Sequence, residues 1–367
     1  GLRHHGYIKF FKPKRIKPLN ELECLVDCTC FSGDTLVLMA DGTYKEIQKI
    51  SQGDAVITHR GRAKRVLGNV ERQLRLGESV HELSVRGFHK KITVTGDHPF
   101  YVLRGNKHCR CGCGKELSSR AISPAALINK NFVTGHHRKV LSGGALPDRC
   151  DRLEFVQVKD FRKREWLLSP WGEFGHNSID PDFARLVGYY AAEGCIPSLT
   201  VRDGMSGVRP RGECVRLAFN INEMDTLVAD AVNICKKLGY GVSTRKWRKT
   251  PNHPYTGVFV NIKSAQLMHF VYDNVGQGSY FKRFSKFIMD SDYESLKNVV
   301  TGLFLGDASV GSNGSIRYGS CNLSLASQVS TILNKFRVGN FLHDNKLSEG
   351  KFGGYTVGIL SGSHRDT

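Results

Sequence analysis

The chain has 367 residues, 40% of them apolar, which is sufficient for packed cores in about two to three domains. Its 53 Lys and Arg residues against 34 Asp and Glu give a formal net charge of +19, which favours a polyanionic partner such as DNA over a merely basic soluble surface. The sequence has no apolar run of about eighteen residues, so no membrane-spanning helix is predicted, and its eleven clustered cysteines favour a reducing, intracellular, cytoplasmic setting over a disulfide framework.

The first hundred residues have the pattern of β-structure after a short basic segment. Residues 1–29 carry five Lys and Arg between positions 9 and 17 and predict no more than a basic strand or arm. From Cys30 onward, short apolar segments alternate with turn residues such as Asp41-Gly42, which favours a hairpin. Thr95 and His98 stand at a Thr-x-x-His spacing in a predicted strand and turn. The pattern predicts an all-β unit.

Two blocks of this unit resemble the N-terminal splicing blocks of inteins, which have the Hint fold. They are Cys30-Phe-Ser-Gly-Asp-Thr and Thr95-x-x-His98. The resemblance implies that residues 1–29 belong to a host protein (extein) in cis and that the Cys30 thiol attacks the carbonyl of Thr29 to form a thioester. It further implies that His98 is the general acid at the scissile amide nitrogen and that Thr95 orients the peptide. The alternative is that Cys30 and His98 are structural residues.

Residues 105–150 contain a cysteine-rich, basic insertion. Cys109, Cys111 and Cys113, with the later His136, can surround one tetrahedral Zn²⁺ ion, and His108 and His137 are competing ligands. The spacing also resembles short cysteine-rich modules of mobile-element proteins. The alternative is a basic loop with incidental cysteines. The β pattern then returns over residues 151–170, followed by a linker that reaches Asp180.

An apolar helix that ends in a single acid is predicted after Asp180, which is a plausible N-cap before Pro181. Its apolar residues recur at helical spacing and are Phe183, Leu186, Val187, Tyr190 and Ala191. A second copy of the pattern occupies residues 300–308, again with Gly at the third position and an acid at the eighth. Small residues at matched positions allow a close helix crossing, which would place Glu193 beside Asp307 as a Mg²⁺ site. Two unrelated buried helices are the alternative.

The sequence after each acid follows the same order. Strand-like segments lead to an apolar helix that is predicted to stop at Gly239 in the first copy and at Gly339 in the second. Sixteen residues beyond each glycine stands a Tyr-Thr pair, Tyr255-Thr256 and Tyr355-Thr356. These matches indicate an internal duplication.

The duplicated pattern resembles the LAGLIDADG homing endonucleases in their single-chain form with two pseudo-symmetric halves. The resemblance implies a DNA endonuclease in which Glu193 and Asp307 bind Mg²⁺, polarise the scissile phosphates and activate water. Lys282 matches the position of a lysine that supports charge in the transition state, and a solvated lysine is the alternative. The strands of each repeat would form a saddle that reads double-stranded DNA. Ala308 stands where the family usually has Gly and would add a methyl group to the helix crossing.

The sequence as a whole predicts a monomeric, multidomain α+β intein fragment. The predicted domains are residues 1–29 as host segment, 30–104 as the N-terminal part of the Hint domain, 105–150 as zinc insertion, 151–170 as returning strands and 171–367 as a two-repeat αββαββα endonuclease. The chain opens without Met and stops at Thr367 before the terminal asparagine of an intein, so either it is a fragment or a second polypeptide supplies the last splicing blocks. The alternatives are a degenerate DNA-binding remnant that neither splices nor cuts, and an autoprocessing Hint protein that splices nothing.

Overall fold

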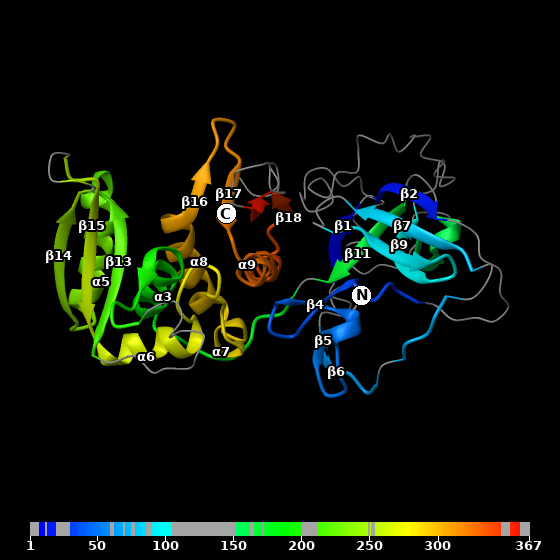
Figure 1. Ribbon diagram of the computed structural model, residues 1–367, viewed down its shortest axis with the longest axis horizontal. Helices are drawn as coiled ribbons and strands as arrows, with labels where there is room; N and C mark the ends of the chain where they lie inside the picture. Colours follow the sequence, from blue (N-terminus) through cyan, green and yellow to red (C-terminus); the bar gives the residue numbers. More distant parts are fainter. Residues whose placement is uncertain are drawn as a thin grey trace, which may run out of the picture. The chain divides into compact units, whose positions relative to one another are not determined.

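The computed structural model divides the chain into two compact units, whose elements are labelled in Figure 1. The first unit consists of residues 1–173 with 333–344 and 359–367, and the second of residues 174–332 and 345–358. None of the described helices is long and apolar enough to cross a membrane. The described residues are 7–11, 13–19, 30–58, 62–68, 70–74, 78–85, 90–104, 152–161, 165–170, 172–199, 212–248, 250, 254–345 and 353–359.

The described part of residues 1–173 consists of strands and two short 3₁₀ turns. Its strands are β1 (Tyr7–Phe11), β2 (Pro13–Leu19), β3 (Leu36–Leu38), β4 (Tyr44–Glu46), β5 (Ala55–Ile57), β6 (Ala63–Arg65), β7 (Val80–Val85), β8 (Ile92–Thr95), β9 (Pro99–Arg104), β10 (Arg152–Gln157) and β11 (Glu165–Pro170). The 3₁₀ turns are η2 (Ile47–Lys49) and η3 (Val158–Asp160). The strands form antiparallel sheets in the orders β1-β11-β9-β10, β2-β7-β8, β3-β4 and β5-β6.

The predicted hairpin at Asp41-Gly42 joins β3 to β4. Gly42 adopts a positive φ of 80°, and Asp41 Oδ1 accepts a hydrogen bond from the Thr43 N–H at 3.0 Å. Glycine adopts this left-handed backbone at little cost, and an Asp side chain that bonds the backbone two residues on reinforces the turn. This hairpin is therefore confirmed as a product of local sequence.

Strands β9 and β10 lie on either side of the predicted insertion. They pair antiparallel from Pro99 opposite Gln157 to Arg104 opposite Arg152. The chain therefore leaves β9 and returns in β10 at neighbouring positions of one sheet, as an insertion between paired strands requires. The core beneath these strands consists of Leu83, Val85, Val94, Val102, Val156, Val158 and Leu167.

The second half of the chain mixes helices with strands, as predicted. Its first copy contains α3 (Pro181–Glu193), β12 (Gly194–Cys195), β13 (Cys214–Asn220), the turns η4 (Ile221–Glu223) and η5 (Met224–Val228), α5 (Ala229–Lys237), β14 (Gly241–Trp247), β15 (Gly257–Lys263) and α6 (Ala265–Asn274). After α7 (Lys286–Met289), the second copy contains α8 (Tyr293–Asp307), β16 (Ala308–Val310), β17 (Ile316–Ser320), α9 (Leu323–Lys335), β18 (Asn340–Asn345) and β19 (Gly354–Ile359).

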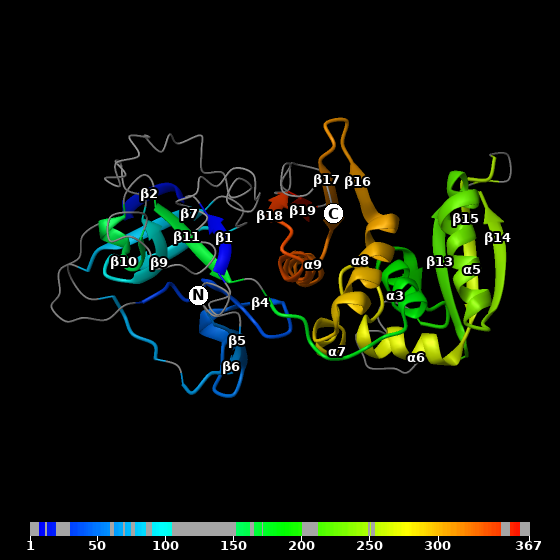
Figure 2. The same cartoon turned by 180° about the vertical axis from the view of Figure 1, so that it is seen from behind.

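Two four-stranded sheets carry the duplication. Their strand orders are β12-β13-β15-β14 and β16-β17-β19-β18. The first, second, third and fourth strands of each copy therefore occupy the same positions in the two sheets. Helices α3 and α8 pack against each other between β13 and β16, as Figures 1 and 2 show from opposite sides. The internal repeat that the sequence indicates is thus an αββαββ unit present twice.

Two capped helices meet at a pair of glycines. The Asp180 side chain accepts a hydrogen bond from the Phe183 N–H at the start of α3, and Asp292 does the same for Ser295 at the start of α8. A Cβ atom on Gly188 would lie 2.1 Å from the carbonyl oxygen of Val299, and one on Gly302 would lie 2.2 Å from that of Arg185. The backbones therefore touch at this crossing, and only glycine fits there.

Ala308 lies outside the crossing. It is the residue that follows α8 and begins β16, with an extended backbone (φ −90°, ψ 147°) that alanine adopts without strain. The prediction that the Ala308 methyl group enters the helix crossing is therefore wrong, because the close contact is made by Gly188 and Gly302. At the matched position in the first copy, a Cβ on Gly194 would lie 2.3 Å from the ring of Tyr190, so glycine is required there.

Two details of the predicted repeat are also wrong. Tyr255-Thr256 precedes β15, whereas Tyr355-Thr356 lies within β19, so the two pairs are not equivalent. The helix of the second copy turns at Arg337, with φ 61°, and not at Gly339, whereas Gly239 does end the helix of the first copy, with φ 72°. Sequence spacing fails here because loops of different length shift the two copies against each other.

Candidate functional site

The two acids of the repeat stand at the ends of the crossed helices. Glu193 is the last residue of α3 and Asp307 the last of α8, and each is followed directly by the first strand of its sheet. A Cβ on Gly306 would lie 3.3 Å from Cγ of Glu193, so the Glu193 side chain lies against the residue that precedes Asp307. The crossing thus brings the two predicted carboxylates to one place.

Burial and mutual repulsion shape the protonation of this pair. The pKa of Glu193 is raised to about 7, first by burial and then by the charges of Asp307 and Glu223, while nearby Lys282 opposes the shift. Burial also raises the pKa of Asp307, and Lys282 again opposes it. Asp307 is more exposed to water than Glu193, so water weakens the effect of burial on Asp307. A divalent cation between the two carboxylates would relieve this repulsion.

Lys282 is buried beside the acids, so the solvated-lysine alternative is wrong. Only 4% of the residue is exposed, and its Nζ donates hydrogen bonds to the carbonyl oxygens of Tyr190 (2.7 Å) and Ala191 (3.2 Å). These carbonyls belong to the last turn of α3, where a cation is favoured. Burial lowers the pKa of Lys282 to about 8, against the attraction of Asp307 and Glu193.

The loop that carries Lys282 connects the two copies of the repeat, and the sequence did not predict this role. Gln277 Oε1 accepts a hydrogen bond from the Ile196 N–H at 3.0 Å and lies 3.0 Å from the Tyr190 hydroxyl. On the other side, Asn322 Nδ2 donates to the Lys282 carbonyl oxygen at 2.7 Å. The signal that the sequence offers is that Gln277 stands between two glycines. In the structure both glycines adopt positive φ.

The sheet of the first copy presents a basic surface. Alternation buries Val215, Leu217 and Phe219 of β13 toward the helices and leaves Arg216 on the opposite face. The three strands β13, β14 and β15 carry four Lys and Arg residues and no acid. The register places Arg216, Arg245 and Lys263 on the outer face, whereas Lys246 pairs with the buried Val258 and belongs to the other face. Two further basic residues follow β14 in the sequence. The guanidinium carbon of Arg248 lies 5.2 Å from the ring centroid of Tyr255, and Lys249 is outside the described residues. Such a face suits phosphate contacts.

The first unit brings two of its predicted residues together. The Cys30 N–H donates a hydrogen bond to Thr95 Oγ1 at 2.9 Å, and the Thr95 N–H donates to the Cys30 carbonyl oxygen at 2.9 Å. Thr95 is only 1% exposed, so this contact is shielded from water. The nitrogen in question is the amide that joins Cys30 to Thr29. Thr95, rather than His98, therefore lies at the bond that the resemblance marks for cleavage.

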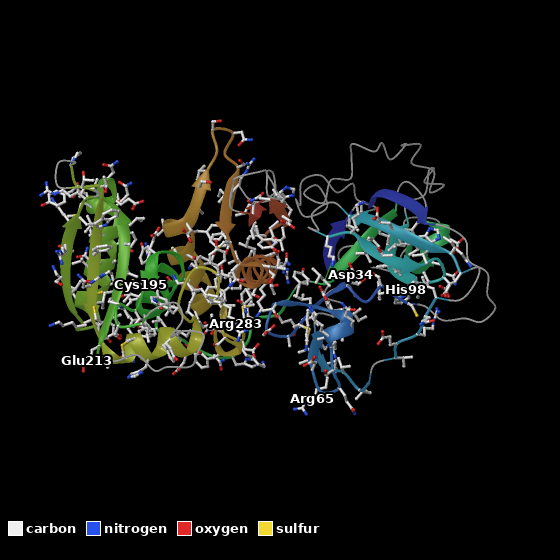
Figure 3. All side chains as sticks on the ribbon, viewed as in Figure 1. Asp34, Arg65, His98, Cys195, Glu213 and Arg283 are labelled. Carbon is white, nitrogen blue, oxygen red and sulfur yellow. The ribbon has the colours of Figure 1, made fainter. Side chains whose placement is uncertain are left out.

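His98, labelled in Figure 3, stands in the turn between β8 and β9. The centroid of its ring lies 4.1 Å from that of the Phe31 ring, and the backbone N–H of His98 donates a hydrogen bond to the Thr95 carbonyl oxygen at 3.1 Å. Nδ1 of His98 is buried and has no hydrogen-bond partner among the described residues. Burial lowers the pKa of His98, with Asp97 opposing, so the imidazole is neutral near pH 7.

The predicted zinc ligands lie outside the described residues. This applies to Cys109, Cys111, Cys113 and His136 and to the competitors His108 and His137. Within the described residues no group of three or more His, Cys, Asp or Glu is placed to hold a metal ion. The zinc site stays a prediction.

No family model matches the chain. It is 25% identical over 288 residues to the iron–sulfur cluster assembly SufBD family protein Rv1461 of Mycobacterium tuberculosis, a match that covers 77% of this chain and 29% of that protein. It is 26% identical over 178 residues to the uncharacterized protein MJ0043 of Methanocaldococcus jannaschii, covering 45% of this chain and 22% of that protein. The chain thus spans less than a third of the length of these relatives.

Two solved structures are similar to 49% of this chain. One is the homing endonuclease I-DmoI in complex with DNA and Mn, at 16% identity, a TM-score of 0.36 and 89% coverage of that chain. The other is full-length DUF199/WhiA from Thermatoga maritima, at 12% identity, a TM-score of 0.32 and 51% coverage. Similarities this weak carry no conclusion about the function of this chain.

Proposed function

We propose that the protein is a DNA endonuclease of the LAGLIDADG type that cleaves double-stranded DNA with Mg²⁺ held between Glu193 and Asp307. The observation that carries the proposal is the glycine crossing of two duplicated helices, each of which ends in one of these acids. Two carboxylates supply the oxygen ligands that Mg²⁺ prefers. The pKa of Glu193 is raised first by burial and second by the negative charges of Asp307 and Glu223, and a cation would offset these charges. Bound there, the metal would polarise the scissile phosphate and lower the pKa of an attacking water.

The surrounding residues have distinct tasks in this proposal. Lys282 places a positive charge at the end of α3, where it anchors the turn that precedes Glu193 and can offset charge on the phosphate. Gln277 and Asn322 tie its loop to both copies, which keeps the two acids in register. The basic outer face of the first sheet supplies phosphate contacts that make binding salt-sensitive.

A cleavage assay tests the nuclease. The native chain, Glu193→Gln, Asp307→Asn and the exposed control Asp225→Asn are offered a library of long duplexes with Mg²⁺. We expect site-specific cutting by the native chain and the control, and loss of cutting with retained binding in the two site variants. Equal cutting by all four proteins would sink the assignment. Salt-sensitive binding without cutting by the native chain would instead favour the degenerate remnant.

A second activity is proposed for the first unit because the Cys30 amide N–H is bonded to Thr95 Oγ1. In this proposal the Cys30 sulfur attacks the carbonyl carbon of Thr29, the bond to the Cys30 nitrogen breaks, and that nitrogen leaves as an amine after taking up a proton. Thr95 holds the amide, and the neutral imidazole of His98 would take up the proton of the Cys30 thiol and deliver a proton to the leaving nitrogen. The product is a thioester that an external thiol can cleave.

Thiol-induced cleavage tests this second activity. Incubation with a strong thiol should release residues 1–29 from the native chain and from the control Cys195→Ser, because Cys195 lies in the other unit. Cys30→Ala should abolish the release, and Thr95→Ala should slow it. Equal release from Cys30→Ala would remove Cys30 from the chemistry.

The zinc insertion remains a third, structural proposal. The chain purified under reducing conditions should contain about one zinc ion, as expected for a closed thiolate and imidazole site. Joint replacement of Cys109 and Cys113 by Ser should remove it. Full zinc occupancy in that double variant would show that the ligands lie elsewhere.

A further inference from the structure

Two arginines occupy matched positions beside the two acids. In the first sheet, Arg216 pairs with Cys195, which is the second residue after Glu193. In the second sheet, Arg317 pairs with Ser309, which is the second residue after Asp307. Figure 3 labels Cys195 at the end of α3, where β12 begins. The register thus makes Arg216 and Arg317 pseudo-symmetric counterparts.

Neighbouring side chains hold Arg216 in place. Its Nε donates a hydrogen bond to Asn261 Oδ1 at 2.8 Å, and its guanidinium carbon lies 4.8 Å from the ring centroid of Phe259. Trp247 stacks on Phe259 at 5.8 Å with 18° between the ring planes. These contacts use Nε and one face of the guanidinium, and no hydrogen bond from the described residues occupies the two terminal nitrogens.

Arg317 lacks every part of this support. The residue that pairs with it on β19 is Gly358, where the first copy has Asn261. The position that matches Phe259 is occupied by Thr356, whose hydroxyl accepts a hydrogen bond from Asn345 Nδ2 at 2.8 Å. Arg317 is exposed, and among the described residues no hydrogen bond or ion pair fixes its guanidinium.

The charges of the two sheets differ in the same direction. The strands β13, β14 and β15 hold four Lys and Arg residues and no acid. The described strands β16 to β19 hold Arg317 as their only Lys or Arg, together with Asp344. A stronger hold on DNA by the first sheet follows, because each cation contributes to phosphate contact.

Resting on the proposed DNA endonuclease, we infer that Arg216 reads a guanine in the half-site bound by the first repeat, and that Arg317 makes no comparable base-specific contact. The two terminal nitrogens of arginine match O6 and N7 of guanine in the major groove. An arginine already fixed by Asn261 and Phe259 loses less conformational freedom on binding than a mobile one. The target is therefore read more strictly in one half than in the other.

A base-by-base profile tests the inference. Once the native chain has selected a target, every single-base variant of it is offered to the native chain, Arg216→Lys, Asn261→Ala and the counterpart Arg317→Lys. We expect the native chain to discriminate about 5- to 150-fold for guanine at one position in the first half-site. Arg216→Lys keeps the charge and should lose that discrimination, and Asn261→Ala should reduce it. Arg317→Lys should leave the profile unchanged.

Three outcomes would overturn the inference and each is distinct from failure of the nuclease. A uniform loss of affinity at all positions in Arg216→Lys would identify a phosphate contact, and an unchanged profile would show no DNA role. Equal relaxation in Arg317→Lys would remove the asymmetry. If Arg216→Lys fails to fold, the discrimination for guanine is measured in Asn261→Ala instead. Binding profiles replace cleavage profiles if the native chain binds without cutting, whereas no binding to any duplex refutes the proposed function itself.

Discussion

The two copies of the repeat share a backbone plan and differ in surface chemistry. Both have a capped helix, a glycine at the crossing, a terminal acid and four strands in the same order. Among the residues that the structure describes, the first copy stacks Arg216 on the ring of Phe259 where the second has no such pair, and the second copy alone has a non-glycine residue, Arg337, at its left-handed helix end. The crossing is constrained from both sides at once, whereas the outer sheet faces carry exposed residues such as Arg245 and Arg317. Packing therefore preserves the interior of the copies while their surfaces diverge.

The largest expected effect is at the shared crossing and should be the same from either side. Gly188→Ala and Gly302→Ala each place a Cβ about 2 Å from a backbone carbonyl oxygen, which cannot move without separating the helices. Alanine gains about 1 kcal/mol of helix propensity, so we expect a net loss of about 2 kcal/mol or more in the free energy of unfolding. Thermal unfolding measures it. Gly319→Ala is the control, because a Cβ there meets nothing within 4 Å; stability equal to this control would contradict the tight crossing.

A smaller effect separates the two acids by pH. The native pKa of Glu193, about 7, lies above the ordinary value of 4.5, so the folded state binds the proton more tightly than the unfolded state does. The free energy of unfolding should therefore fall as pH rises from about 4.5 to 7, by about 1 to 2 kcal/mol without metal, because water partly screens this incompletely buried carboxyl. Glu193→Gln removes this dependence, and the exposed Asp307 contributes less.

Calorimetry in EDTA between pH 5 and 7.5 checks this pH effect as the difference between native chain and variant. The range stops at pH 7.5, where Lys282, with a pKa lowered to about 8, still keeps most of its proton in the folded state. A difference that stays constant with pH would show that Glu193 is not held in its protonated form. Added Mg²⁺ should raise the stability of the native chain mainly at the upper end of the range.

The smallest expected effects concern the helix ends, and they have opposite signs in the two copies. Gly239 (φ 72°) and Arg337 (φ 61°) both adopt the left-handed backbone that glycine favours. Gly239→Ala should lower the free energy of unfolding by about 1 kcal/mol, and Arg337→Gly should raise it by about 0.5 to 1 kcal/mol. Denaturant titration of both variants measures the pair. Changes of equal sign would show that local backbone strain does not decide these positions.

Local chemistry explains what could be predicted from the sequence. The Asp180 cap, the Asp41-Gly42 hairpin and the repeated acids depend on residues within one turn or one helix, and the structure has each of them. The close approach of Glu193 and Asp307 also follows from matched glycines on two helices. The roles of Cys30, Thr95 and His98 remain predictions, although Thr95 lies at the expected peptide bond.

Tertiary structure alone decided the remaining features. The sequence could not place Lys282 under the end of α3, because its partners Tyr190 and Ala191 are about ninety residues earlier in the chain. Residue counting treated the two Tyr-Thr pairs as equivalent, and they are not. Strand register is fixed by cross-strand packing, so the number of residues between matched positions can differ between the two copies. The support of Arg216 by Asn261 and Phe259 likewise arises only when β13 and β15 pair. Short-range hydrogen bonds and helical spacing depend on residues close together in the sequence, so they can be predicted from it. Contacts between distant strands and loops form only after the whole repeat has packed.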